Sequence, residues 1–322
     1  MIEKLFDIGF LVYDSRSGST LLAREMTAHL EGVFVTPEIG FDSLLALSES
    51  ELARLGWPAV LRRLYRGYDF RNFDLPPELA VSLVHDAKGD PLRAAEAIRA
   101  LLGAYTIKHA GPNTRWVVVK NGSHLRYWRV LQKLFGNTLR LIHITRDPRA
   151  VINSKLRTPR PYRTQEVMAW GGPLLAALRW RRYMDQTRQA ALSGLAVHTL
   201  RYEDLLAGPH TVMTAIGQFL GVSTRLAPTS NTYAVPKRER TIHVRVATQG
   251  FDTAREIAWR RELSRCDQFQ IETLCGSAMS RLGYRTQSTS GALHTAAAWC
   301  LGLPRAIIGT LRHALIESRP MR

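Results

Sequence analysis

The stretch from Asp14 to Thr20 constrains the fold of this chain more than any other part of the sequence. Residues 6–13 before it are apolar enough for a buried strand, and residues 19–30 after it place apolar side chains at helical spacing. Between them lies a short loop of small hydroxyl residues with one glycine and one arginine. A loop of this kind turns backbone N–H groups toward one point, and the following helix adds its positive N-terminal end. The stretch therefore predicts a phosphate or sulfate site formed by the following residues: Arg16, Ser17, Gly18, Ser19 and Thr20.

The order of residues in this loop differs from that of a nucleotide-triphosphatase loop. There, a lysine directly follows the last glycine, and a serine or threonine comes next. Here Ser19 follows Gly18, and the cation is Arg16, two residues before the glycine. The loop retains the geometry but lacks the triphosphatase lysine. An ordinary tight turn is the alternative.

A second stretch, residues 139–154, repeats the pattern of a buried strand that leads into a helix. Arg146 stands at the predicted strand end, and Pro148 suits the first helical turn, where its missing N–H costs little. Ser154 follows about two turns into that helix. Arg146 and Ser154 could bind a second anion, whereas a local Arg146–Asp147 ion pair is the alternative.

Together, the two stretches resemble the 3′-phosphoadenosine-5′-phosphosulfate (PAPS)-dependent sulfotransferases, in the bacterial branch related to tyrosyl-protein and carbohydrate sulfotransferases. In that family an (R/K)-S-G-T-T loop holds the 5′-phosphosulfate, and an arginine with a serine eight positions later holds the 3′-phosphate. Residues 16–20 and the Arg146–Ser154 pair match both motifs in spacing and order. The resemblance covers residues 6–285 and implies PAPS and a hydroxyl-bearing acceptor as substrates, with no metal.

The resemblance also implies a tyrosine near the adenine and a basic loop over the cofactor. Tyr202 lies in a Y-E-D-L sequence like that of the family, although packing into the core is the alternative. Residues 229–250 contain the basic loop, in which Arg240 is the candidate for the cofactor contact. The expected cofactor contacts are Arg16, Ser17, Gly18, Ser19, Thr20, Leu21, Arg146, Ser154, Tyr202 and Arg240.

The resemblance suggests two candidates for the catalytic base. Glu38 stands at a strand end, slightly further from the loop than in the tyrosyl-protein branch. His124 belongs to a segment resembling the family's K-x-P-x-H, with Gly122 replacing the proline, and Lys120 would face the sulfuryl group. The expected catalytic set is therefore Arg16, Glu38, Lys120 and His124. Glu38 could instead be an exposed carboxylate, and His124 could cap its helix or hold the loop.

Apolar runs predict strands near residues 6–13, 33–36, 116–120, 139–145 and 196–200, separated by helical patterns. We expect an α/β, P-loop-like three-layer fold with a central, mostly parallel sheet of about five strands. Residues 1–285 form the expected sulfotransferase domain. Within it, residues 42–113 are a helical insertion and a candidate lid over the acceptor, and a long helix is expected over residues 165–192.

Residues 286–322 form a C-terminal amphipathic tail outside the resemblance. Its first part lacks charged residues but is too polar to span a bilayer. Leucine, isoleucine and arginine from residue 299 onward suit an interfacial helix, and packing back on the domain is the alternative. Peripheral contact with an anionic membrane is thus one expectation.

The net charge of +17 indicates polyanionic partners. No zinc-finger spacing or RNA-binding signature supports nucleic acid. The three cysteines form no CxxC pair, and the N-terminal residues lack a signal-peptide pattern, so we expect a cytoplasmic location, with contact at the inner membrane surface. The oligomeric state stays open.

The resemblance implies transfer of the sulfuryl group of PAPS to a hydroxyl, and the acceptor stays open among a cell-envelope glycan or glycolipid, a small alcohol, a phenol and a protein tyrosine. One alternative is a nucleotide kinase-like P-loop protein, which would need magnesium and ATP. Another is a basic module that binds polyanions or membranes.

Overall fold

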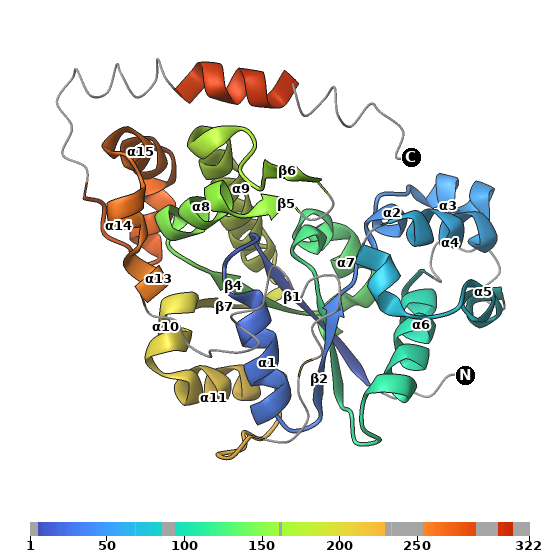
Figure 1. Ribbon diagram of the computed structural model, residues 1–322. Coiled ribbons are helices and arrows are strands. Elements are labelled where there is room, and N and C mark those ends of the chain that lie inside the picture. Colours follow the sequence, from blue (N-terminus) through green and yellow to red (C-terminus); the bar gives the residue numbers. More distant parts are fainter. Residues whose placement is uncertain are drawn as a thin grey trace.

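A parallel five-stranded sheet forms the centre of the molecule (Figure 1). The structure is a computed structural model and describes residues 6–67, 69–85, 94–160, 163–228, 233, 254–287 and 302–311. The strand order is β2-β3-β1-β4-β7, and each neighbouring pair is parallel. The strands are β1 (Asp7–Tyr13), β2 (Val33–Glu38), β3 (Trp116–Lys120), β4 (Arg140–Thr145) and β7 (Ala196–Arg201). The expected α/β fold and its five strands are confirmed.

The helices that connect and extend the sheet have the following bounds: α1 (Ser19–His29), α2 (Asp42–Leu45), α3 (Glu49–Leu55), α4 (Trp57–Arg66), η1 (Asp69–Phe73), α5 (Pro77–His85), α6 (Ala94–His109), η3 (Gly122–Tyr127), α7 (Trp128–Phe135), η4 (Gly136–Thr138), α8 (Pro148–Arg157), α9 (Gly172–Leu192), α10 (Tyr202–Ala207), α11 (Pro209–Leu220), α13 (Ala254–Ile257), α14 (Trp259–Glu262) and α15 (Arg265–Arg281). Residues 302–311 are also helical.

Helices cover both faces of the sheet, which explains why its strands are continuously apolar. On one face, side chains of α1, α10 and α11 pack against alternate residues of β1, such as Leu11. On the other face, α6, α7 and the insertion helices α2–α5 pack against Phe10 and Val12. A third cluster joins α8, α9 and α15 around the buried indole of Trp180. Because the strands are parallel, their carboxyl ends meet at one edge of the sheet, where such folds bind ligands.

One segment differs from its expected structure, and another agrees with it. Residues 163–167 form β6, which pairs with β5 (Pro159–Arg160) in a small antiparallel hairpin, so the long helix expected from residue 165 begins only at Gly172. Gly172 has a left-handed backbone (φ 72°) and Pro173 favours the first turn, so this pair starts the helix. Within residues 42–113, the described part is helical, as expected.

Candidate active site

The loop that links β1 to α1 is built around a glycine that no other residue could replace. Gly18 precedes the first residue of α1 and has a left-handed backbone (φ 89°). A Cβ at this position would lie 2.2 Å from Cδ2 of Tyr202. The N–H of Ser17 donates to the carbonyl of Asp14 (3.2 Å), which tightens the turn. Both backbone conformation and space therefore require glycine here.

Two buried hydroxyl groups at the loop and the start of α1 could donate hydrogen bonds to an anion. The Oγ of Ser17 and the Oγ1 of Thr20 are buried, and neither has a hydrogen-bond partner in the described part of the chain. An unsatisfied buried hydroxyl typically costs about 1–3 kcal/mol. Ser19 and Leu21 are also buried, in the first turn of α1. The loop therefore fits an anion that accepts hydrogen bonds from these hydroxyls and from the helix N-terminus.

The two anion motifs of the sequence contact each other directly. Nε of Arg16 donates to Oγ of Ser154 on α8 (3.0 Å). Nη1 of Arg146 donates to the carbonyl of Arg16 (3.4 Å). The residues lie more than a hundred positions apart, yet they converge because β1 and β4 are neighbours in the sheet. Arg16, which belongs to the first motif, thus contacts both Arg146 and Ser154, the two residues expected to bind a second anion.

Tyr202 lies between the two motifs rather than standing free. Its ring packs against Gly18, and the guanidinium of Arg146 lies over its face, 4.5 Å from the centroid. Only 8% of the residue is exposed. The ring therefore supports the loop and Arg146 from the side, and the expected contact of Tyr202 with adenine stays a prediction.

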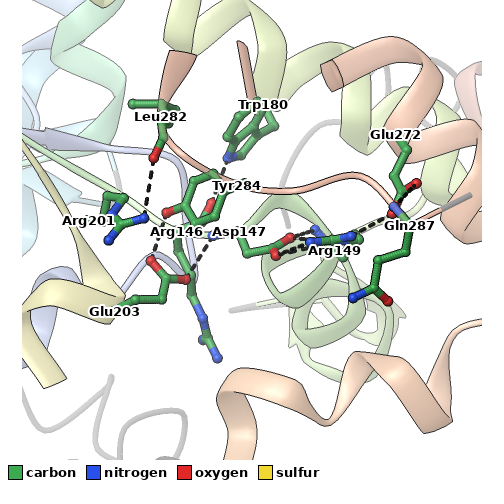
Figure 2. A network of polar contacts seen from close by, with 10 residues as sticks. All are labelled: Arg146, Asp147, Arg149, Trp180, Arg201, Glu203, Glu272, Leu282, Tyr284 and Gln287. Carbon is green, nitrogen blue, oxygen red and sulfur yellow. Dashed lines mark hydrogen bonds and ion pairs between the residues drawn. The ribbon is translucent and has the colours of Figure 1, made fainter. Parts of the chain in front are cut away.

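A network of polar contacts behind Arg146 holds its backbone in place (Figure 2). The indole N–H of Trp180 donates to the carbonyl of Arg146 (3.2 Å). The N–H of Asp147 donates to Oε1 of Glu203 (3.0 Å), and the hydroxyl of Tyr284 donates to Oε2 of Glu203 (2.7 Å). Burial raises the pKa of Glu203. Sequence reasoning did not identify Glu203 or Tyr284 as supports, because their partners become visible only after folding.

The same network extends to the C-terminal helix α15. Nη2 of Arg149 donates to Oδ2 of Asp147 (2.7 Å), and its Nη1 donates to Oε1 of Glu272 on α15 (2.5 Å). The guanidinium also lies over the ring of Trp259 at 4.0 Å. All three charged side chains are almost fully buried, so the contacts fix α15 against the start of α8.

A buried ion pair also ties the loop to α8. Nζ of Lys155 lies 2.6 Å from both carboxylate oxygens of Asp14, and both residues are about 5% exposed or less. Because Lys155 follows Ser154, this pair and the bond between Arg16 and Ser154 join the same two segments. The sequence offered only a weak signal for it, an acidic residue before the loop and a lysine on the helix.

Glu38 and Lys120 meet at the carboxyl ends of β2 and β3, where they are register partners. Nζ of Lys120 lies 3.5 Å from Oε2 of Glu38. Lys120 is buried, whereas 28% of the Glu38 side chain is exposed. Nδ2 of Asn72 in the insertion donates to the carbonyl of Glu38 (2.9 Å). An accessible carboxylate beside a buried cation can accept a proton from a molecule that enters from solvent.

His124 is buried beside the chain that follows β2. Its Nε2 accepts a hydrogen bond from the N–H of Phe41 (3.0 Å), and its ring stacks on that of Phe41. The residue has no exposed surface, and burial lowers its pKa to about 4. The ring therefore holds the chain after β2, which is the alternative considered from the sequence, and a role as the base stays a prediction.

We expect the buried imidazole of His124 to make stability depend on pH. Its pKa is lower in the folded chain than the ordinary value of 6.5, so the unfolded chain binds the proton more readily. The contribution of His124 to the free energy of unfolding is then fully present above about pH 6.5. It falls by about 1.4 kcal/mol per pH unit as the pH is lowered toward 4. Urea unfolding of wild type and His124→Gln across this range measures the effect. If the free energy of unfolding changed with pH equally in the two proteins, this expectation would be contradicted.

Arg240 lies outside the described residues, so its role stays a prediction. Within the residues that the structure describes, there is no group of three or more histidine, cysteine, aspartate or glutamate residues that could hold a metal ion.

The comparisons with known proteins agree with this geometry. A family model described as "Sulfotransferase family" matches residues 10–225. Carbohydrate sulfotransferase 5 of Mus musculus is 26% identical over 170 residues, which is 46% of this chain. That match spans only 42% of the mouse protein.

Two solved structures resemble the chain over most of its length. One is the sulfotransferase domain of the Synechococcus PCC 7002 olefin synthase, with a TM-score of 0.53, 23% identity and coverage of 86% of this chain and 96% of that one. The other is a sulfotransferase domain from the curacin biosynthetic pathway, with a TM-score of 0.53, 18% identity and coverage of 88% and 99%. At these identities the likeness concerns the fold.

Proposed function

Because the chain belongs to the sulfotransferase family, we propose that it transfers the sulfuryl group of PAPS to an acceptor hydroxyl without a metal ion. The observation that carries this proposal is the junction of two anion sites. The loop presents the hydroxyls of Ser17 and Thr20, which have no partner among the residues that the structure describes, and Arg16 connects this loop to Ser154 and Arg146. A nucleotide with phosphate groups on both sides of its ribose matches two joined anion sites.

In this proposal, different residues of the chain carry out different parts of the transfer. PAPS, when bound, supplies a sulfuryl group attached to a phosphate leaving group. Arg16 and the N–H groups of the loop bind the charge that grows on the leaving side, and such preorganised donors are typically worth about 3–4 kcal/mol each. Glu38 accepts the proton of the acceptor hydroxyl. Lys120, 3.5 Å from Glu38, keeps that carboxylate in place and adds positive charge beside it.

For the acceptor, we propose a sugar hydroxyl of a cell-envelope glycan or glycolipid. The mouse relative is named a carbohydrate sulfotransferase, and the basic chain suits an envelope rich in anionic groups. The insertion provides the entrance, because Asn72 within it contacts Glu38. A panel of glycans, lipid-linked sugars, small alcohols and phenols with PAPS would separate the classes. Sulfation of phenols alone would exclude the sugar assignment.

The cofactor assignment is tested by calorimetry with 3′-phosphoadenosine-5′-phosphate (PAP), 5′-AMP and ATP, with and without magnesium. We expect tight, metal-independent binding of PAP that ATP does not match. Arg146→Ala should weaken PAP by about tenfold or more while it leaves 5′-AMP unchanged, since 5′-AMP lacks the 3′-phosphate. Arg146→Lys keeps the charge and serves as the matched control. Equal preference for magnesium-ATP would overturn the proposal in favour of a kinase-like protein.

Glu203 should affect the same site through the backbone next to Arg146. Glu203→Ala removes the acceptor of the Asp147 N–H and frees the backbone next to Arg146. We expect PAP affinity to fall by about tenfold, with 5′-AMP affinity unchanged, because a hydrogen bond to a charged group is worth about 1.5–3 kcal/mol. Glu203→Gln keeps an acceptor oxygen and should retain most of the affinity. A loss of 5′-AMP binding equal to that of PAP would show general disruption instead.

A further inference from the structure

The helix formed by residues 302–311 packs on the domain through its small residues. A Cβ at Gly302 would lie 2.5 Å from Nε2 of Gln270 on α15, and one at Gly309 would lie 2.6 Å from Cα of Gly171, just before α9. Gly302 and Gly309 are buried, and Ala306 between them is partly buried. At 3.6 residues per turn these three positions share one face. The helix thus contacts the domain with residues that almost lack side chains.

The large apolar side chains of this helix point the other way. Its four large aliphatic residues are between 49% and 64% exposed: Leu303, Ile307, Ile308 and Leu311. They cover an arc on the side opposite Gly302, Ala306 and Gly309. An amphipathic helix of a soluble domain normally turns such residues inward. Here the arrangement is reversed, so packing on the domain leaves the apolar face without a partner in the described part of the chain.

The helix lies at the same end of the molecule as the candidate active site. α9 ends just before β7 begins, so it runs opposite to the sheet and starts at the carboxyl ends of the strands. Gly309 contacts the residues directly before α9, and Arg305 lies 4.0 Å from Asp267 of α15. In Figure 1 the helix is red and lies above α9, at the end toward which the strands run. A surface that covers the helix would therefore face the end that holds Glu38 and Lys120.

The composition of this part of the chain favours an anionic lipid surface over a protein partner. Residues 302–322 contain four arginines and one glutamate, and the Arg305 side chain is 65% exposed beside the apolar arc. The exposed face itself is aliphatic, without the tyrosine and tryptophan that dominate protein interfaces. Aliphatic side chains flanked by arginines bind at the boundary between lipid headgroups and acyl chains. No helix in the described part of the chain is long and apolar enough to cross a bilayer.

We propose that the outward face of helix 302–311 docks the enzyme on an anionic membrane, with its active-site end toward the bilayer. This inference adds an interaction surface to the proposed function and does not depend on the identity of the cofactor. It accounts for a helix that turns glycines inward and leucines and isoleucines outward. It also agrees with an acceptor held at a membrane.

Vesicle flotation of the full chain tests this proposal. The probes are vesicles of phosphatidylcholine alone and of equal parts phosphatidylcholine and phosphatidylglycerol. We expect binding to the second kind only, and a loss of at least about tenfold in Ile307→Glu/Ile308→Glu. The matched control is Ile107→Glu/Leu192→Glu, which places the same charges at exposed positions near the opposite end of the sheet. This control should bind as wild type does.

Because Ile307 and Ile308 are exposed, their replacement should leave the melting temperature and PAP binding unchanged, which separates docking from folding and from the proposed function. The proposal is overturned if the wild type does not bind anionic vesicles or if the Ile307→Glu/Ile308→Glu variant binds them as well as the wild type does. It is also overturned if the control variant loses as much binding. A wild-type dimer that the same variant disperses, seen by sedimentation, would assign the face to a second copy of the chain instead.

Discussion

Replacing Glu38 by glutamine is expected to lower kcat by about 10²–10⁴-fold, the usual contribution of a general base. Glutamine has the same size, and its backbone carbonyl still accepts from Asn72, but its amide cannot take the hydroxyl proton. PAP affinity should stay within a few-fold of wild type, since Glu38 is outside the anion loop. Steady-state kinetics with PAPS and a sulfated product, together with PAP calorimetry, measure both quantities.

The control for this variant is Glu31→Gln, an exposed carboxylate just before β2, near the other end of the strand. It should leave kcat unchanged. Glu38→Asp keeps a carboxylate and should retain more activity than the glutamine variant. A Glu38→Gln enzyme with more than about a tenth of wild-type kcat would exclude Glu38 as the base.

Lys155→Met is expected to lower the free energy of unfolding by about 3–5 kcal/mol, because it leaves the Asp14 carboxylate buried without its cation. Methionine preserves most of the apolar stem. Since Asp14 begins the anion loop, the variant should also weaken PAP. Urea unfolding at neutral pH measures the stability, and calorimetry measures the binding.

The control is Lys108→Met, which breaks an exposed pair of similar length (2.8 Å to Asp74) and should cost less than about 1 kcal/mol. The double variant Asp14→Asn/Lys155→Met removes both buried charges. It should be more stable than Lys155→Met alone, because the uncompensated charge is gone. Equal costs for Lys155→Met and Lys108→Met would show that the buried pair contributes no more than a surface pair.

Sequence patterns predicted the fold well because they depend on local chemistry. The five strands appear as apolar runs, since both faces of the sheet are covered. Gly18 and its small neighbours indicate a phosphate loop, because the backbone conformation of such a loop depends on only a few consecutive residues. The hairpin formed by β5 and β6 was missed because residues 163–167 lack the apolar alternation of a strand.

The residue types of the site were predicted from the sequence, but the surroundings of two residues were not. His124 was a candidate base from its place in a motif, yet it is buried and bonded to the N–H of Phe41. The structure shows that Tyr202 packs on Gly18 and under Arg146, and its contact with adenine stays a prediction. The direction in which a side chain points from a short helix or strand end depends on the layers around it, which no spacing rule describes.

By itself, the sequence determined the order of strands and helices along the chain, the anion loop and the family to which its motifs belong. Only the tertiary structure decided that Arg16 bonds Ser154, that Lys155 neutralises Asp14 and that Glu38 faces Lys120. These partners lie far apart in the chain and meet because the strand order β2-β3-β1-β4 brings the strand ends together. Local backbone preferences act over a few residues, whereas contacts between distant charges depend on which strands become neighbours and in which register they pair.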